Sequence, residues 1–305
     1  MAQLRTLVCG SLLALGATPA MTQSLPGGMY VEGEIALDQL FVGSDNETLA
    51  YGDVTLGGSF GAGSPFGFML GFDVISFDNF TEEAFYGALT WSVGPGMVSV
   101  GVPRFVVDDY ITAPNAGGTE FLTLVLPTLP LSGGSIARNL YLLEDDLDIL
   151  GLRYDADYGA LSVGASAHRV SVPNDIIAVL NFAGTYDLGD TDLMGAVEVI
   201  TEDGSTRANT YLGATYGVGQ FGAGVLYTNF QLPDALDALS IWGSYEIIPD
   251  LTATGTYQSI LGEDFDIVGV DVEYSPGGTF YVRGGGIFGD PIGDDIYSVG
   301  VGYRF

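Results

Sequence analysis

Short segments with alternating apolar and polar residues recur along this chain, and this period of two constrains its fold more than any other feature. One face of the closing segment, for example, carries Tyr297, Val299, Val301, Tyr303 and Phe305. Such alternation is typical of a β-strand whose two faces meet different surroundings. Clusters of Gly, Pro, Asn and Asp separate the segments, as expected for turns. The pattern predicts sixteen strands, at 29–42, 49–61, 66–78, 83–94, 97–109, 148–158, 160–171, 176–188, 192–202, 207–218, 221–231, 238–248, 251–261, 265–275, 279–289 and 295–305.

The connections between these segments alternate in length. Every second connection is tight, namely GAGSP, GPGM, DYG, LGDT, VGQ, IPD and PGG. Those in between are mostly longer or more acidic, namely GSDNETL, SVPND, EDGST, QLPDAL, LGEDF and GDPIGDD. An even number of strands, with short turns at one end and longer loops at the other, is typical of outer-membrane barrels. No apolar run reaches the ~18 residues that a membrane-spanning helix needs.

The alternation does not by itself say which face is buried, because a soluble β-sandwich shows the same pattern. The number of strands helps to decide which face meets water and which meets lipid. A closed barrel of about sixteen strands has an interior too wide for wall side chains to fill, so we expect a wet inner face and an outer face in lipid. Closure also pairs every backbone polar group, which a sheet in hydrocarbon requires. The predicted fold class is all-β, a transmembrane antiparallel β-barrel of about sixteen strands.

The first residues have the features of a secretory signal peptide. A start carrying Arg5 precedes an apolar run of about nine residues, and small residues follow up to Ala20. We expect 1–20 to be the signal peptide, with cleavage after Thr22 as an alternative, and 21–305 to form the outer-membrane barrel. The run is too short for a membrane anchor.

The charge balance excludes several classes of function. Asp and Glu number 38 against 8 arginines with no lysine, for a net charge of −30, so the chain repels nucleic acid. A hydrophobic content of 47% nevertheless argues against disorder. The single cysteine, Cys9, lies in the signal segment, so the exported protein is expected to have no disulfide and no cysteine–zinc site.

With these features the sequence resembles the general (trimeric) porins of Gram-negative bacteria, most closely the alphaproteobacterial type. The resemblance covers the chain after the signal segment and is carried by that segment, the sixteen-strand rhythm, the terminal YRF and a long connection at about 110–147. It implies a cell outer-membrane location, a homotrimer, and contact with membrane lipids and lipopolysaccharide. It also implies that the outer-membrane assembly machinery recognises the carboxy-terminal strand through Tyr303 and Phe305.

The long connection is expected to be functional because it far exceeds ~15 residues in an otherwise tightly connected chain. In the resembled family the third external loop folds into the barrel and sets its narrowest point. Here the apolar part, Phe121 to Leu131, suits packing against the wall. Its polar part is expected to border the aperture, through Glu120, Arg138, Glu144, Asp145, Asp146 and Asp148. A surface loop over the mouth, or one that grips a partner subunit, is the alternative.

The predicted inner face is acidic. The first four strands place Glu32, Glu34, Asp38, Asp53 and Asp73 there without any arginine, a departure from enteric porins. Later strands add further carboxylates, Glu198, Glu246, Asp271 and Glu273. Candidate wall arginines are Arg153, Arg207, Arg283 and Arg304, while Arg104 follows a proline that leaves its side unassigned. For the pore constriction and lumen we select Asp53, Asp73, Arg153 and Arg283, together with the loop residues.

A negative lumen concentrates cations. The sequence therefore predicts a passive diffusion channel for ions and small hydrophilic solutes, weakly cation-selective. A substrate-specific channel and a structural barrel without an open pore stay as alternatives.

An enzyme is not expected. The lone His168 is more typical of a hydrogen-bonding side chain than of a general base. No cofactor is predicted. Ca²⁺ at the acidic clusters near Asp264 and Asp294 is an alternative to simple solvated loops.

Overall fold

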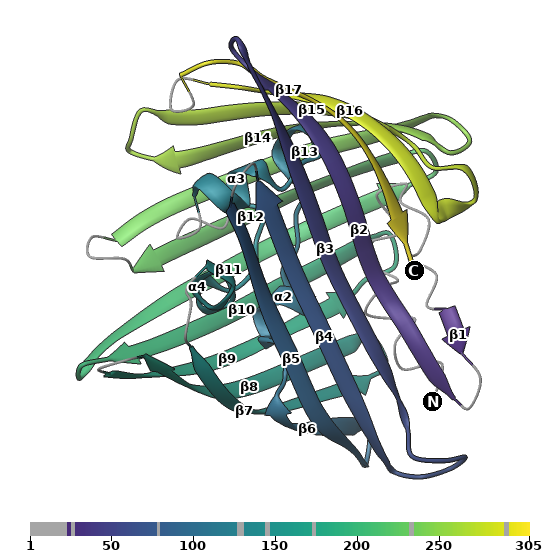
Figure 1. Ribbon diagram of the computed structural model, residues 1–305, viewed down its shortest axis with the longest axis vertical. Helices are drawn as coiled ribbons and strands as arrows, with labels where there is room; N and C mark the ends of the chain where they lie inside the picture. The colour runs from purple at the N-terminus through teal and green to yellow at the C-terminus, as the bar shows by residue number, and fades with distance from the viewer. Residues whose placement is uncertain are drawn as a thin grey trace.

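A computed structural model describes residues 23–25, 28–77, 80–126, 131–143, 147–172, 175–231, 235–289 and 293–305 (Figure 1). The strands are β1 (Gln23–Leu25), β2 (Met29–Val42), β3 (Asp45–Ser59), β4 (Phe66–Phe77), β5 (Phe80–Val93), β6 (Gly96–Val102), β7 (Asp148–Tyr158), β8 (Leu161–Val172), β9 (Asp175–Asp187), β10 (Thr191–Glu202), β11 (Ser205–Val218), β12 (Phe221–Gln231), β13 (Ala235–Ile248), β14 (Leu251–Leu261), β15 (Phe265–Tyr274), β16 (Phe280–Phe288) and β17 (Ile296–Arg304). The helical segments are α2 (Val106–Tyr110), η2 (Ala116–Gly118), α3 (Phe121–Val125), α4 (Ile136–Leu143) and η3 (Pro276–Gly278).

Strands β2 to β17 form a closed, sixteen-stranded antiparallel barrel, as predicted. Each strand pairs with its neighbours in the sequence, and β17 closes the ring by pairing with β2. The short β1 adds to β2, with Gln23 opposite Val31. The start of β2 and the end of β17 lie at the same end as the seven predicted tight turns, which we call the tight-turn end, and we call the opposite end the loop end.

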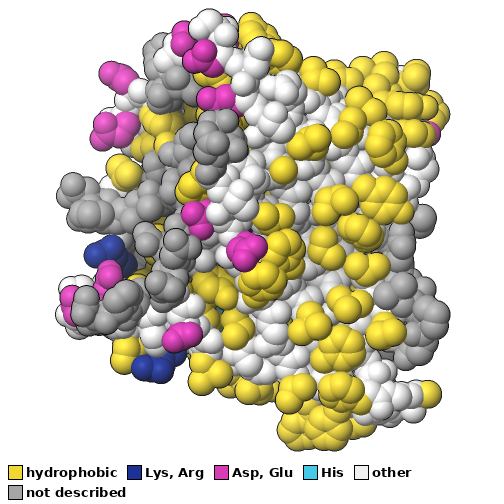
Figure 2. Space-filling model, in the orientation of Figure 1, with side chains coloured by type: hydrophobic (Ala, Val, Ile, Leu, Met, Phe, Trp, Pro, Cys, Tyr) yellow, Lys and Arg dark blue, Asp and Glu magenta, His cyan; other side chains and the backbone are white. Residues whose placement is uncertain are grey.

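The barrel wall turns its apolar residues outward. Along β4, Phe66 and Leu70 are exposed, whereas Gly67 and Met69 between them are buried. Figure 2 shows apolar side chains spread over the wall, with Asp and Glu gathered mainly at the loop end. On β17, the predicted outward residues Tyr297, Val299 and Val301 are all exposed. None of the helices that the structure describes is long and apolar enough to span a membrane.

Several predicted boundaries are wrong. The segment predicted as a strand over 97–109 leaves the sheet after Val102, because Pro103 has no N–H to donate to a ladder, and the chain turns into α2. The connections GSDNETL and EDGST shrink to two-residue turns, 43–44 and 203–204. In the second turn both Asp203 and Gly204 have positive φ, which matches the right-handed twist of the flanking strands. The two ends therefore differ less in loop length than predicted.

The described parts of the long connection lie inside the barrel, as predicted from the resemblance. We call residues 103–147 the inner loop. Its helices α2 and α4 and the segment η2 are enclosed by the strands in Figure 1. The described parts of the loop contact widely separated strands: α2 contacts β8 to β10, α4 contacts β5, and η2 contacts β14 to β16.

The prediction of a wet inner face is wrong for the loop end of the barrel. Inward side chains there are large, apolar and buried, namely Leu40, Leu49, Ile75, Phe230, Ile267, Ile287 and Ile296. They form one core with apolar residues of the inner loop, among them Val106, Ala116, Phe121 and Leu131. Wall side chains alone cannot fill an interior of this width, and the inner loop supplies the missing volume.

Candidate pore lining and constriction

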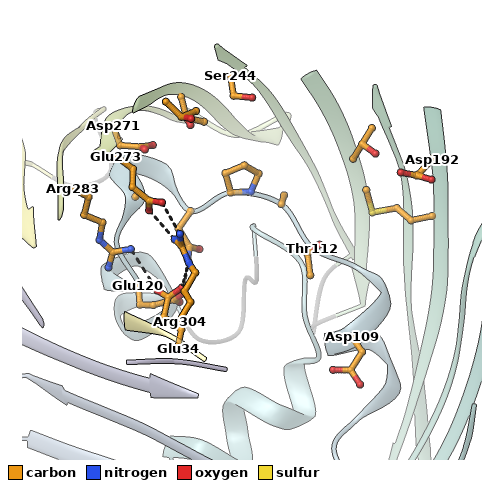
Figure 3. A pocket seen from close by; sticks show the side chains of 18 of the residues that line it. Glu34, Asp109, Thr112, Glu120, Asp192, Ser244, Asp271, Glu273, Arg283 and Arg304 are labelled. Atoms are coloured by element: carbon orange, nitrogen blue, oxygen red, sulfur yellow. Dashed lines mark hydrogen bonds and ion pairs between the residues drawn. The ribbon is translucent and has the colours of Figure 1, made fainter. Parts of the chain in front are cut away.

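An acidic cavity of about 310 Å³ opens inside the tight-turn end of the barrel (Figure 3). We call it the vestibule. Its wall includes the inward residues of β9 to β11 and β13 to β17, and the inner loop forms its floor through residues 109–120. Its charged lining comprises Glu34, Asp109, Glu120, Asp192, Asp271, Glu273, Arg283 and Arg304. Carboxylates outnumber arginines, so the cavity is expected to carry a negative potential.

Both vestibule arginines are engaged by carboxylates. Arg304 donates to Glu273 at 2.6 Å and to Glu34 at 2.8 Å, and Arg283 donates to Asp38 at 2.6 Å. The ring of Tyr281 lies against the guanidinium of Arg304, with 4.3 Å between the guanidinium carbon and the ring centroid. Figure 3 shows Glu34, Glu273, Arg283 and Arg304 on one side of the cavity, with Asp109 and Asp192 on the other.

Three further cavity carboxylates, Glu120, Asp192 and Asp271, form no ion pair with an arginine among the described residues. Glu120 accepts hydrogen bonds from Asn115 at 2.5 Å and Thr123 at 2.9 Å. Asp271 lies on the same wall as Arg283, and no ion pair joins the two in the described part of the chain. The negative charge of the vestibule is thus only partly neutralised from within.

A second charged cluster joins the inner loop to the early strands. Arg104 donates to Asp53 and forms an ion pair with Asp73, each at 2.7 Å, and Arg138 of α4 donates to Asp73 at 3.0 Å. The Asp73 side chain has no exposed surface. The guanidinium of Arg104 also stacks on Tyr86, at 4.6 Å from the ring centroid. Because charge-assisted hydrogen bonds are the strong ones, this cluster fixes α4 against β4.

A third arginine holds the start of the loop. Arg153 on β7 donates to Asp109 at 2.5 Å and to Asp155 at 2.7 Å. It also donates to the carbonyl oxygen of Arg104 at 3.4 Å. Tyr110 donates to Asp155 at 3.3 Å. Helix α2 is thereby fixed to the wall of β7.

Glu198 on β10 anchors the first turn of α4. The Ser135 hydroxyl donates to one carboxylate oxygen, and the Ile136 N–H donates to the other at 3.2 Å. Asn209 on β11 donates to that same second oxygen at 3.0 Å. Glu198 has no exposed surface, so it acts on the loop rather than as a free lumen carboxylate.

Burial changes the acidity of two carboxyls in the inner loop. It raises the pKa of Asp108 to about 7, against the opposing effect of Arg138 and of the Ser135 N–H, which donates at 2.7 Å. Burial also raises the pKa of Glu120. A buried carboxyl holds its proton more tightly because the charged form loses its hydration.

The predicted site residues separate into three groups. Glu120 and Arg283 both line the vestibule. Asp53, Asp73, Arg138 and Arg153 lie in the ion-pair clusters that tie the inner loop to the wall. Their predicted role at an aperture stays a prediction. Glu144, Asp145 and Asp146 lie outside the described residues, as does the predicted signal peptide, 1–20.

Sequence reasoning left Arg104 unassigned, although it joins both carboxylates of the second cluster. The signal that could have placed it is Pro103, since a proline that ends a strand puts the next residue at the start of the loop. The anchoring role of Glu198 was missed as well. Its partner Ser135 directly precedes α4. The two residues are 63 positions apart in the sequence, so their contact depends on the path of the loop.

The remaining predicted residues have local structural contacts. Tyr303 and Phe305 stack edge to face, with ring centroids 5.1 Å apart, and the Phe305 N–H donates to the Gly33 carbonyl oxygen at 2.9 Å. The Nε2 atom of buried His168 lies 2.9 Å from the Pro103 carbonyl oxygen.

Among the described residues no group of three or more His, Cys, Asp or Glu side chains could hold a metal ion. Ca²⁺ near Asp264 and Asp294 stays a prediction.

Solved structures of porins share this fold. The structure superposes on one mutant of Rh. blastica porin with a TM-score of 0.65 at 13% identity, covering 91% of this chain and 100% of that one. A triple mutant of Rhodopseudomonas blastica porin gives 0.63 at 13% identity with the same coverage. A structure described as "Asymmetric conductivity of engineered proteins" gives 0.64 at 13%, again with the same coverage. Neither protein-family models nor curated proteins match the sequence.

Proposed function

We propose that this protein is a passive outer-membrane channel that favours cations and small hydrophilic solutes. The apolar outward wall of the closed barrel supports a position in lipid, where all backbone polar groups must be paired. The fold shared with solved porin structures supports a channel rather than an enzyme.

The acidic vestibule carries the proposal. Six carboxylates and two arginines line it, and the arginines are already engaged by carboxylates. A cavity lined by one sign of charge with low-dielectric walls raises the local concentration of the opposite ion. Ions of positive charge are therefore concentrated at the tight-turn entrance of the barrel.

Conductance of the purified protein in a planar lipid bilayer, with a KCl gradient across it, tests this function. We expect discrete conductance steps and a reversal potential on the cation side. A reversal potential near zero, or on the anion side, contradicts cation preference while leaving a channel. Bound counter-ions that neutralise the carboxylates would give the near-zero result.

A structural barrel without an open pore is the second candidate, and the packed loop end favours it. The inner loop and the wall form one buried core there. Absence of conductance steps, from protein that still migrates as a heat-modifiable barrel, supports this candidate. A substrate-specific channel is not favoured by any contact in the vestibule.

Export through cleavage of 1–20 is part of the proposal and is supported by the apolar run and the small residues of that segment, while a barrel domain over 21–305 is supported by the strand pattern. A homotrimer in a Gram-negative outer membrane, contact with lipopolysaccharide, and recognition of Tyr303 and Phe305 by the assembly machinery rest on the resemblance alone. Ca²⁺ binding by the external acidic loops is tested by melting the protein with and without a chelator.

A further inference from the structure

The inward face of β17 leaves room for side chains of its two neighbouring strands. Two of its buried inward positions are Gly300 and Gly302. A Cβ added to Gly300 would overlap the carboxylate of Asp38 on β2, and one added to Gly302 would overlap the ring of Tyr281 on β16. We call these two glycines the β17 trough. Because the trough carries no side chains, residues of β16 and β2 approach each other across β17.

Arg283 crosses the trough to reach Asp38. The pairing register places Arg283, Gly300 and Asp38 in one row over three strands. The guanidinium donates to both carboxylate oxygens of Asp38, at 3.0 Å and 2.6 Å. Only 10% of the Arg283 side chain and 1% of the Asp38 side chain are exposed. This bidentate ion pair therefore neutralises the charge of Arg283 at the wall.

Arg283 makes this contact although other carboxylates lie nearer in the sheet. Glu273 on β15 is directly opposite Arg283, and Asp271 is two positions away on the same strand. Directly opposed Cβ atoms are about 5 Å apart, whereas Asp38 is two strands away, at about 10 Å. Both oxygens of Glu273 are bound by Arg304 instead. Asp271 is thus left in the vestibule lining without an ion pair among the described residues.

The ring of Tyr281 lies against both arginines of the vestibule. It is fully buried over the trough, and its hydroxyl donates to Glu34 at 2.5 Å. The ring centroid lies 4.3 Å from the guanidinium carbon of Arg304 and 5.4 Å from that of Arg283. Both distances are within the range of a cation–π contact. Tyr281 thereby stabilises the observed positions of the two guanidinium groups.

We propose that the β17 trough sets the cation preference of the vestibule by holding Arg283 against Asp38 and away from Asp271. This inference rests on the proposed channel function and names the residues that determine its selectivity. An arginine that turned from Asp38 to Asp271 would leave the number of charges unchanged. It would nevertheless cancel a carboxylate that faces the lumen, and the unpaired negative charge would then lie on a buried group.

The first test moves Arg283 without changing the number of charges. Gly300→Ala places a methyl group where the Asp38 carboxylate lies, so the ion pair across β17 is broken. In planar bilayers with a KCl gradient, we expect the cation-to-anion permeability ratio to fall by about twofold, since Arg283 then compensates Asp271. Gly284→Ala is the matched control on β16 and should keep the wild-type ratio, because its added Cβ meets only an ordinary contact at 3.6 Å.

A double variant identifies the cause of that fall. Gly300→Ala combined with Arg283→Gln keeps the altered wall but removes the guanidinium, so we expect a ratio at or above that of the wild type. A fall that persists in the absence of Arg283 overturns the proposal.

A second route leaves the trough intact and applies even if Gly300→Ala does not migrate as a heat-modifiable barrel. Asp38→Asn removes the partner of Arg283 and adds no bulk to the wall. We expect the permeability ratio to fall as far as it does in Asp271→Asn, although Asp38 is buried and Asp271 lines the cavity. A clearly smaller fall in Asp38→Asn means that Arg283 does not compensate a lumen carboxylate, and it overturns the proposal.

Failure of the channel itself gives a different result. If the wild type shows no conductance steps, or a reversal potential at zero or on the anion side, the proposed function fails and the role of the trough fails with it. If the wild type prefers cations and the Gly300→Ala barrel has the same ratio, the channel stands and only the role of the trough is overturned.

Discussion

The two ends of the lumen are lined by the same strands but have different interiors. At the tight-turn end, the inward positions of β14 to β17 carry Thr252, Asp271, Arg283 and Arg304, and they surround a cavity. Towards the loop end, the inward positions of β15 and β17 carry Ile267 and Ile296, which are buried against other apolar groups. The pairing register is continuous along these strands.

This contrast shows that alternation sets only which residues face inward, whereas the chemistry of those residues decides what fills the space. Carboxylates and hydroxyls do not pack against apolar loop segments without loss of hydration. Isoleucine and leucine gain from the same contact. The path of the inner loop, held by ion pairs near mid-barrel, separates the two environments.

The largest expected effect comes from breaking the charged cluster between them. Arg104→Ala leaves the fully buried Asp73 with one arginine and Asp53 with none. Loss of one partner from a buried ion pair costs about 3–5 kcal/mol. Arg207→Ala is the control, since its ion pair with Glu202 is exposed, and we expect ~0–1 kcal/mol. Denaturant unfolding in detergent, followed by gel mobility, measures both. Equal losses would contradict the structural role given to the cluster.

A second prediction compares the inside and the outside of one strand. Leu40 on β2 is fully buried in the loop-end core, whereas Leu37 is 50% exposed on the outer wall. Leu40→Ala is expected to lower the free energy of unfolding by about 2–5 kcal/mol because it leaves a cavity in a packed core. Leu37→Ala should lower it clearly less, since detergent or lipid fills the space that the side chain leaves. The same unfolding measurement applies, and a smaller loss for Leu40→Ala means that the loop end is not packed.

A third prediction concerns the vestibule alone. Glu120→Gln combined with Asp271→Asn removes two vestibule carboxylates that form no ion pair with an arginine among the described residues. We expect the cation-to-anion permeability ratio to fall by about two- to threefold, because the local negative potential falls. The control Asp264→Asn lies at the loop end, outside the vestibule lining. Reversal potentials in a salt gradient measure the ratio, and an equal change in the control would place the selectivity elsewhere.

The smallest expected effect on stability comes from a change of pH. The pKa of Asp108 is about 7 in the folded barrel against an ordinary value of 3.8. The charged groups that act on it are Arg138, Asp109 and Glu198. The folded barrel therefore binds a proton that the unfolded chain gives up between about pH 4 and pH 7, so lowering the pH from about 8 to about 5 stabilises the fold.

We expect the free energy of unfolding to be higher at the lower pH, by on the order of 2 kcal/mol, because the Asp108 carboxyl is ionised in the folded barrel only at the higher pH. Asp108→Asn should flatten this dependence. Glu120, whose pKa is also raised, acts in the same direction. Denaturant unfolding in detergent at the two pH values measures the difference, and a loss of stability on acidification contradicts the sign.

Much of the barrel was predictable because strand alternation is a local property. The segment 148–158 coincides with β7, and the outward set on β17 follows directly from its residues. The turn lengths at the loop end were not predictable, since Gly43 and Gly204 allow two-residue hairpins where polar residues suggested loops.

The sequence predicts which charged residues belong to the site, but not which carboxylate pairs with which arginine. Asp53, Asp73 and Arg153 were selected as charged wall groups and Arg138 as a charged loop group, and they form ion pairs that join the loop to the wall. Which carboxylate meets which arginine depends on the path of the loop, and contacts such as Arg138 with Asp73 span 65 positions. No local pattern encodes such contacts.

The difference between the wet tight-turn end and the packed loop end is tested most directly by the rate at which single cysteines react with a water-soluble thiol reagent. Thr254→Cys places a thiol in the vestibule lining, and Ile267→Cys places one in the loop-end core, both on inward positions of adjacent strands. In the Cys9→Ser background, we expect the Thr254→Cys barrel to react rapidly and the Ile267→Cys barrel to react at least about tenfold more slowly, as burial excludes the reagent. Equal rates at the two positions would mean that water fills the lumen from end to end, and would contradict the division described above.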